Sequence, residues 1–260
     1  MTRNDRGATG RPVSVAGKIM AILAAFSPGD VRLTLTEICH RAHLPLATGH
    51  RLIRELTGGG FLEKLPDGSY RVGLRLWQIG AQAAGPRDLR ELALPYLEDL
   101  YEATHENVQL AVWRAGRALY LERLHGPRSV PIVTRVGSEL PLHATGVGKV
   151  LLAYAGDDAI ETALSKGLRA LTPHTVTDTD ALRAELAEVR RTGLAFTDQE
   201  MTLGTRSIAA PIRTGDGRVV AALSLTTRQR KAELHRLAPA VRTAARALSR
   251  DVATHWHPSD

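Results

Sequence analysis

Residues 34–56 read TLTEICHRAHLPLATGHRLIREL, and this stretch decides the fold of the N-terminal part of the chain. Thr34 and Glu37 have the spacing of a capping box, in which the threonine side chain caps a helix and the glutamate side chain reaches back to the cap. A short helix that buries Ile38 is therefore expected. After a tight turn, Pro45 suits the first turn of another helix, because its missing N–H would have no intrahelical partner there.

The flanking residues add another helix and a hairpin. Before this stretch, apolar residues three, four and seven apart predict a helix that begins at Ser14 and stops at Pro28. After it, three consecutive glycines end the helix, and two short strands, 61–65 and 70–72, flank an Asp-Gly turn of the kind found in β-hairpins. Three helices followed by a hairpin predict a winged helix-turn-helix.

Positive charge is concentrated in the first third of the chain. The 260 residues carry a net charge of +7. Residues 1–75 contain 11 Lys or Arg and 6 Asp or Glu, a net charge of +5, and the remainder has a net charge of +2. This asymmetry favours an anionic partner for the N-terminal domain. The alternative is that the charge only keeps the surface soluble.

Composition excludes several protein classes. No apolar run approaches the ~20 residues of a membrane-spanning helix, and the polar N-terminus, with Arg3, Arg6 and Arg11, does not resemble a secretory signal. We therefore expect a cytoplasmic protein without a membrane segment, whose residues 1–12 form a disordered tail. Cys39 is the only cysteine, which excludes an intrachain disulfide and a cysteine-rich zinc site.

The rest of the chain mixes helices and strands. A connecting helix is predicted over 74–84 and a second helix over 87–105, with Pro95 as a kink or break. Further strands are expected at 108–114, 118–123, 130–135, 194–197, 207–212 and 219–226, and further helices at 146–155, 157–164, 180–192 and 231–253. This order predicts an α+β domain around one antiparallel sheet. The expected division is a winged helix-turn-helix at 13–74, a linker helix at 75–86 and an α+β domain at 87–255.

Several motifs in a fixed order connect the sequence to a known family. In the N-terminal part they are Leu35-Thr36-Glu37-Ile38, Leu44-Pro45, His50-Arg51-Leu52 and Asp67-Gly68-Ser69-Tyr70-Arg71-Val72-Gly73. In the C-terminal part they are Arg135-Val136-Gly137, Pro141-Leu142-His143-Ala144-Thr145-Gly146-Val147-Gly148-Lys149, Leu171-Thr172-Pro173 and Ile208-Ala209-Ala210-Pro211-Ile212. By these motifs, residues 13–252 resemble the IclR family of bacterial transcription regulators.

The resemblance implies a fold and a set of partners. The implied fold is a winged-helix DNA-binding domain, a linker helix and a GAF-like α+β domain that binds an effector. The implied assembly is a homodimer or a dimer of dimers that binds a palindromic operator in double-stranded DNA, commonly as a repressor. The implied effector is a small organic or aromatic acid. Neither enzymatic activity, nor a metal, nor a cofactor is expected.

The helix that begins near Pro45 is the expected recognition helix, whose N-terminal side chains face base edges in the major groove. Arg51 suits a bidentate contact to guanine, and Thr48 suits a thymine methyl. His50 and Arg54 are better placed for phosphates, which position a protein without reading sequence. The complete set of candidate DNA-binding residues, including two on the hairpin, is Thr36, Pro45, Ala47, Thr48, His50, Arg51, Arg54, Lys64 and Arg71. For each arginine, the alternative is a solvated surface charge.

The expected recognition helix departs from the usual family pattern. Leu46 and Ala47 stand where the family often has a lysine and a serine, and Gly49 stands where it often has a valine. Glycine inside a helix costs about 1 kcal/mol relative to alanine. The operator sequence is therefore the least transferable part of the resemblance.

The resemblance also implies a ligand pocket beside the helix that begins in the Thr-Gly-Val-Gly-Lys run. A helix N-terminus offers free N–H groups to a carboxylate, and hydroxyls two residues apart on a strand share one face. The candidate effector-binding residues are Thr145, Gly146, Val147, Asp198, Glu200, Thr205, Ser207, Ser224 and Thr226. The alternative is that these groups only cap the helix and bond the backbone. Met201 and Leu203 favour a more apolar ligand than is usual.

Catalytic motifs are incomplete in this sequence. The run Gly146–Lys149 resembles a phosphate loop, but position 143 is His and position 150 is Val, so the pattern fails at both ends. The alternative function is a small-molecule-binding enzyme that uses the C-terminal pocket. Asp198 and Glu200 are the one evident acid–base pair for such an enzyme, and ligand binding explains them equally well.

Overall fold

The computed structural model describes residues 14–82, 86–228 and 231–256. The expected disordered tail at 1–12 lies outside the described residues. The chain divides between Ala83 and Ala84 into two compact units, which are considered separately below. In the described parts of the chain, none of the helices is both long and apolar enough to cross a membrane.

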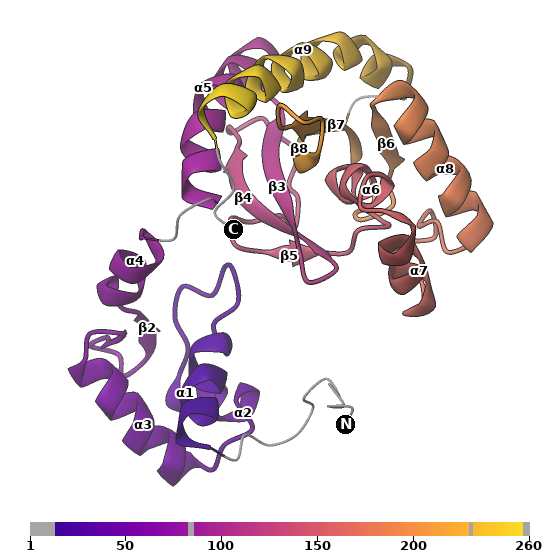
Figure 1. Ribbon diagram of the computed structural model, residues 1–260. Coiled ribbons are helices and arrows are strands. Elements are labelled where there is room, and N and C mark those ends of the chain that lie inside the picture. The colour runs from indigo at the N-terminus through magenta and orange to yellow at the C-terminus, as the bar shows by residue number, and fades with distance from the viewer. Residues whose placement is uncertain (1–13, 83–85, 229–230, 257–260) are drawn as a thin grey trace. The chain divides into compact units, whose positions relative to one another are not determined.

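The N-terminal unit is a winged helix-turn-helix, as predicted (Figure 1). Its elements are α1 (Val15–Ala24), α2 (Leu35–Arg41), α3 (Leu46–Gly58), β1 (Leu62–Lys64), β2 (Tyr70–Val72) and α4 (Leu74–Gly80). The capping box is present, because Thr34 Oγ1 accepts from the Glu37 amide and Glu37 Oε2 accepts from the Thr34 amide. Pro45 is the extended N-cap residue of α3 rather than part of its first turn, so the expected start of this helix was wrong by one residue.

The core of the N-terminal unit explains the unusual glycine of α3. Ile22, Ile38, Leu52 and Ile53 are fully buried where α1, α2 and α3 meet. Gly49 lies at the contact between α3 and α2, and a Cβ built on it would lie 2.2 Å from Cys39 Sγ. Because real Cβ atoms do not approach other atoms so closely, glycine is what permits this helix packing.

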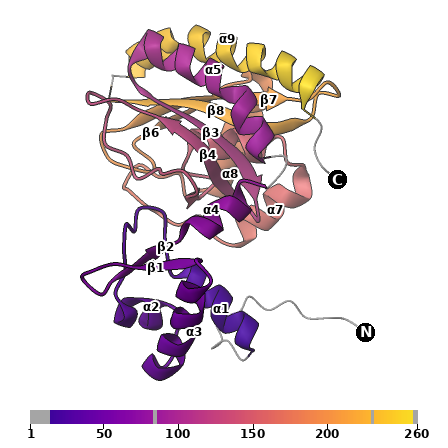
Figure 2. The same ribbon diagram turned by 90° about the vertical axis from the view of Figure 1, so that its left-hand side faces the viewer.

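The C-terminal unit is a six-stranded antiparallel sheet between two layers of helices. Its strands follow the order β5 (Glu139–Leu140), β4 (Arg117–Leu124), β3 (Asn107–Arg114), β8 (Val219–Thr227), β7 (Arg206–Arg213) and β6 (Ala195–Asp198). The long helices α5 (Pro86–Thr104) and α9 (Lys231–His255) lie side by side over one face (Figures 1 and 2). The opposite face carries α6 (Gly146–Ala153), with α7 (Asp157–Ser165) and α8 (Thr179–Thr192) beside it.

The two faces of the sheet belong to two separate apolar clusters. In β8, Leu223 and Leu225 pack with α5 and α9, whereas Ala222 packs with α6. In β7, Ile208 likewise packs with α5 and α9, whereas Ala209 packs with α6. This division follows from the alternation of side chains along a strand. The predicted α+β architecture around one antiparallel sheet is therefore confirmed.

Two local expectations were wrong. Residues 130–135 form a loop instead of a strand. The Val130 carbonyl accepts from Asn107 Nδ2 at 2.9 Å and the Thr134 carbonyl accepts from Arg123 Nη1 at 2.7 Å, so side chains bind these groups in place of a neighbouring strand. The break, one of the two alternatives expected at Pro95, is also absent, since α5 is continuous through this residue.

Gly49→Ala tests the close contact between α2 and α3. Overpacking costs ~1–3 kcal/mol, and the higher helix propensity of alanine recovers ~1 kcal/mol. We expect the variant to lower the free energy of unfolding of the N-terminal unit by about 1–2 kcal/mol in urea titrations. The matched variant Gly49→Ala/Cys39→Ala removes the clashing sulfur, so the two substitutions should be strongly non-additive. A Gly49→Ala protein that is more stable than wild type would contradict the assigned contact.

Candidate functional site

The exposed face of α3 carries most of the predicted DNA-binding residues. Five of them are exposed and Thr48 is half-buried; the exposed five are Pro45, Ala47, His50, Arg51 and Arg54. Arg51 Nη1 donates to Glu55 Oε1 at 2.9 Å, and both side chains are 56% exposed. Such a surface pair is worth ~0–1 kcal/mol, so Arg51 can leave Glu55 at little cost. The exposed face of α3 therefore presents the Arg51 guanidinium, which Glu55 orients without preventing it from binding another anion.

The predicted residues outside α3 are also exposed. Thr36 lies on α2 and Lys64 on β1. On β2, Arg71 makes a two-pronged contact to Glu63, with Nε and Nη2 donating at 2.8 and 2.9 Å. This pair lies directly across the hairpin, since Glu63 and Arg71 are register partners.

An internal hollow, here called the inner cavity, lies in the C-terminal unit between α6 and the sheet. It leaves ≈ 410 Å³ of empty space, part of it open to solvent. Its walls include seven of the predicted effector-binding residues, namely Thr145, Gly146, Val147, Thr205, Ser207, Ser224 and Thr226. The structure thus brings together residues that are up to 81 positions apart in the sequence.

The register of the sheet places a block of hydroxyl groups against the inner cavity. Thr226 pairs with Ser207, and Ser207 pairs with Thr197 on the next strand. Thr197 Oγ1 and Ser207 Oγ lie 2.6 Å apart. All three side chains are at least nine-tenths buried. Because partners in register point to the same side of a sheet, one face of three strands becomes polar.

Gln109 is the polar side chain of this wall that protein groups satisfy least. It is 3% exposed and pairs in register with Ser224. Its Oε1 accepts from Ser224 Oγ at 2.9 Å and from Thr226 Oγ1 at 3.4 Å. Its Nε2 is buried and has no hydrogen-bond acceptor in the described structure. An unsatisfied buried amide costs ~1–3 kcal/mol, so an acceptor that reached this donor would remove that cost.

The first turn of α6 forms the opposite wall. Thr145 is the N-cap residue, and its Oγ1 accepts from the Gly148 amide at 3.2 Å. The amides of Gly146 and Val147 precede the first intrahelical hydrogen bonds, so they retain free donors. Burial raises the pKa of the Tyr120 phenol, although hydrogen bonds with the hydroxyls of Thr145 and Thr134 oppose this. Tyr120 therefore stays neutral. Among the residues that the structure describes, no charged side chain lines the inner cavity.

Asp198 and Glu200 are not brought to the wall of the inner cavity. Asp198 Oδ1 lies 2.8 Å from Arg206 Nε, its register partner on β7. Glu200 is 5% exposed, and both of its oxygens accept from Lys149 Nζ at 2.7 Å. Sequence reasoning placed these carboxylates with the ligand because it did not pair them with the cations of neighbouring elements.

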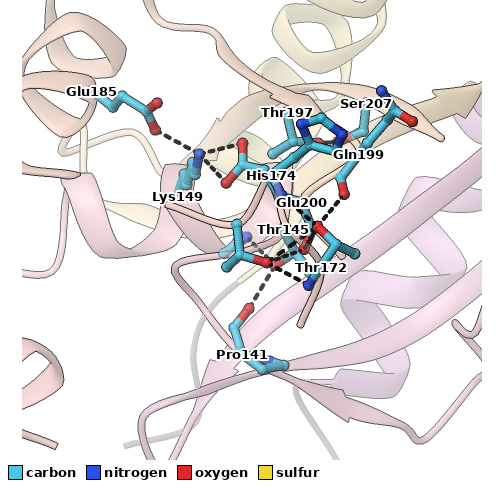
Figure 3. A network of polar contacts seen from close by, with 12 residues as sticks. Pro141, Thr145, Lys149, Thr172, His174, Glu185, Thr197, Gln199, Glu200 and Ser207 are labelled. Atoms are coloured by element: carbon cyan, nitrogen blue, oxygen red, sulfur yellow. Dashed lines mark hydrogen bonds and ion pairs between the residues drawn. The ribbon is translucent and has the colours of Figure 1, made fainter. Parts of the chain in front are cut away.

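The ion pair of Lys149 ties α6 to the loop after β6 (Figure 3). Lys149 is 1% exposed and also donates to Glu185 Oε2 on α8 at 2.5 Å. Burial raises the pKa of Glu200, and the Lys149 ammonium opposes this. The backbone carbonyls of Gln199 and Glu200 are also hydrogen-bonded. Thr172 Oγ1 donates to the Gln199 carbonyl and Thr175 Oγ1 donates to the Glu200 carbonyl, each at 2.7 Å.

This clamp positions one wall of the inner cavity. Met201 and Thr202 follow Glu200 directly, Thr205 lies three residues further along the chain, and all three line the cavity. Lys149 lies one turn after Thr145, whose carbonyl accepts from the Lys149 amide. The ion pair is therefore a support for the wall and not part of the binding surface.

Several wall residues were absent from the set of candidate effector-binding residues, although Met201 was noted as favouring an apolar ligand. They are Gln109, Tyr120, Ile132, Val133, Thr134, Leu140, Ala144, Thr197, Met201 and Thr202. A signal existed for Gln109, which is a polar residue inside an otherwise buried strand. A signal also existed for Thr197, which faces the predicted Ser207 across two antiparallel strands. No sequence signal pointed to residues 132–134 as wall residues, because their position depends on the course of a loop.

Comparison with known proteins agrees with this geometry. A family model for the IclR C-terminal domain of bacterial transcriptional regulators matches residues 81–250, and one for the IclR helix-turn-helix domain matches residues 15–66. The chain belongs to the IclR family. It is similar to the HTH-type transcriptional regulator XynR of Escherichia coli K12, with 33% identity over 239 residues that cover 90% of this chain and 94% of that protein.

Other relatives agree on the class of function. The chain is 29% identical to the transcriptional repressor IclR of Escherichia coli K12, over 84% of this chain and 81% of that protein. The structure of an IclR homolog from Microbacterium hydrocarbonoxydans, complexed with 4-hydroxybenzoate, has 36% identity and a TM-score of 0.86, and the match covers 92% of this chain and 99% of that one. This IclR-family chain is thus a DNA-binding transcriptional regulator, as the sequence motifs predicted.

Lys149→Met tests whether the clamp supports this IclR-family cavity. Removing one partner of a buried ion pair costs ~3–5 kcal/mol, and we expect a loss of this size in the unfolding of the C-terminal unit at neutral pH. Without the ammonium, the pKa of Glu200 rises further above its ordinary value of 4.5. A carboxyl whose pKa is higher in the folded state costs stability as the pH rises above its unfolded value. The deficit should therefore shrink as the pH falls through the raised folded pKa of Glu200 toward 4.5, and it should stay constant below about 4.5.

The matched double variant Lys149→Met/Glu200→Gln carries no buried carboxylate. We expect it to recover part of the lost stability and to lose the pH dependence of the deficit. If the single and double variants unfold alike at every pH, Glu200 does not carry the charge that Lys149 compensates.

Proposed function

We propose that this regulator is a repressor that binds a palindromic operator and responds to a small organic or aromatic acid held in the inner cavity. The observation that carries the effector part is the Nε2 of Gln109, a buried donor with no acceptor in the described structure. The relatives support the class, since one is named a transcriptional repressor and one is described as complexed with 4-hydroxybenzoate.

The recognition helix supports the operator part. On α3, the half-buried Thr48 and the exposed Arg51 read base edges, and His50 and Arg54 bind phosphates. On the hairpin, Lys64 and Arg71 reach the DNA backbone or the minor groove, while Glu63 releases Arg71 in favour of the more highly charged nucleic acid. The remaining members of the proposed surface are Thr36, Pro45 and Ala47.

The walls of the inner cavity fit an acid without any cationic side chain. The amides of Gly146 and Val147 and the positive end of the α6 dipole accept the carboxylate. The hydroxyls of Ser207, Ser224 and Thr226 and the Gln109 amide bind polar substituents on the opposite side. Val147 and Met201 contact the apolar body of the ligand. In this arrangement Asp198 and Glu200 do not contact the ligand and act through Arg206 and Lys149. An enzyme that used this cavity would therefore lack Asp198 and Glu200 as an acid–base pair in its walls.

The N-terminal unit supports a homodimer. Helix α4 exposes Leu74, Trp77 and Ile79, which are 69%, 69% and 54% exposed, and α1 exposes Val15 and Met20. Exposed apolar side chains of this size favour an interaction surface. A second copy of the chain is the occupant we propose, because a palindromic operator requires two recognition helices related by a two-fold axis.

Arg51→Ala tests base reading. The operator is first selected with wild-type protein from a random DNA pool, and affinities are then measured by gel shift. Loss of a bidentate arginine–guanine contact costs ~1–3 kcal/mol, so we expect roughly 5–150-fold weaker operator binding and a much smaller loss on random DNA. Arg183→Ala is the matched control. Arg183 lies in the C-terminal unit, where it forms an exposed ion pair with Glu161. Equal losses on both DNAs would contradict the role in base reading.

Gln109→Leu tests the effector site. The variant keeps a side chain of similar size but removes its amide. A buried donor without an acceptor costs ~1–3 kcal/mol, and a ligand removes this cost only in the wild-type protein. We therefore expect roughly 5–150-fold weaker binding of 4-hydroxybenzoate, or of the best acid in a thermal-shift panel, in calorimetric titrations. Gln78→Leu makes the same change at an exposed position of α4 and should have no effect. Unchanged affinity in Gln109→Leu would remove the amide from the site.

A further inference from the structure

A second hollow of the C-terminal unit, here called the outer cleft, is larger than the inner cavity. It leaves ≈ 1640 Å³ of empty space, against ≈ 410 Å³ counted in the same way for the inner cavity. Its walls are the turn between β3 and β4, the segment 140–143, helix α7 and the segment 166–171. Leu140 and Met201 line both hollows.

The floor of the outer cleft is apolar. Leu142 and Leu152 are 4% and 0% exposed, and they continue the cluster that packs around α6. Trp113 and Leu168 are half-buried at the edges of the same cluster. The indole of Trp113 therefore presents a flat surface inside the hollow, where a ring or a short acyl chain can pack.

The rim of the outer cleft is basic. Arg117, Lys166 and Arg169 line it, and Asp158 is the one carboxylate among the described lining residues. Arg117 already donates to the Glu139 carbonyl at 2.8 Å. Lys166 and Arg169 are exposed and form no ion pair with any residue that the structure describes.

The ammonium of Lys166 is directed toward the opposite wall of the cleft. A Cβ built on Gly116, in the turn between β3 and β4, would lie 3.6 Å from Lys166 Nζ. The amine thus reaches from the end of α7 to the strand turn, over the apolar floor. A cation above an apolar floor is the arrangement that binds a molecule with an acidic group and an apolar body.

We propose that the outer cleft is a second ligand site, which binds an organic anion made of a carboxylate or sulfonate on an aromatic or acyl body. The apolar body packs on Trp113 and Leu168, and the anionic group pairs with Lys166 and Arg169. The positive charge of the rim favours an anion. The recessed floor favours a small molecule that can enter the cleft and disfavours a protein partner with a flat surface. This site is separate from operator binding and from the ligand of the inner cavity.

The test uses 8-anilinonaphthalene-1-sulfonate, a sulfonate on an aromatic body, as the probe. The sequence has three tryptophans, so Trp77→Phe/Trp256→Phe leaves Trp113 as the reporter. In the full-length chain with this background, we expect saturable quenching of Trp113 emission with one probe per chain. Adding Lys166→Glu and Arg169→Glu should weaken the probe's affinity at least tenfold, because the rim becomes acidic.

Two control variants separate this proposal from its rivals. Arg183→Glu reverses an exposed arginine elsewhere on the unit, and Gln109→Leu alters the inner cavity; both should keep the probe's affinity within about twofold. Probe binding that is lost in Gln109→Leu but kept in Lys166→Glu/Arg169→Glu would place the anion in the inner cavity and overturn the proposal. Absence of quenching, together with loss of self-association in Lys166→Glu/Arg169→Glu on sedimentation, would also overturn it, because the cleft would then bind a second copy of the chain.

Discussion

The two-residue period of the central strands is the constraint on which the C-terminal unit depends. On β3, β7 and β8, one set of side chains packs under α5 and α9, and the alternate set faces α6. The second set changes from alanine to Gln109, Ser207 and Ser224 within the same strands. A single sheet therefore provides an apolar core on one side and a polar binding wall on the other. A slip of one residue in register would reverse both at once.

The N-terminal unit depends on a contact of a different kind. Its helices meet so closely that Gly49 faces Cys39 Sγ with no room for a methyl group. The sequence pattern predicted the helices, the capping box at Thr34 and the hairpin, because these depend on neighbours within a few residues. It treated Gly49 as a cost to the helix, because the compensating contact comes from another helix and is invisible in local propensity.

The same distinction explains which parts of the candidate site were predictable. Thr145, Gly146, Val147, Ser224 and Thr226 were implied by the family resemblance. Local rules agree with it, because the first three lie at a predicted helix start and the other two alternate on a predicted strand. Glu200 was assigned to a ligand, yet its partner is Lys149 on another helix. Residues 130–135 were read as a strand, although side chains of Asn107 and Arg123 hold them as a loop. Each error concerns a partner that is distant in the sequence.

The buried ammonium of Lys149 has a consequence for how such sensors diversify. Its charge is neutralised by Glu185 and Glu200 behind the wall, so the electrostatic work that keeps the fold together is done away from the ligand. The inner cavity is then lined by amide and hydroxyl groups. A single substitution, such as Ser224→Ala, replaces one of these polar groups by an apolar one. New ligand preferences can therefore arise by single substitutions on the strand faces, while the scaffold beneath them stays the same.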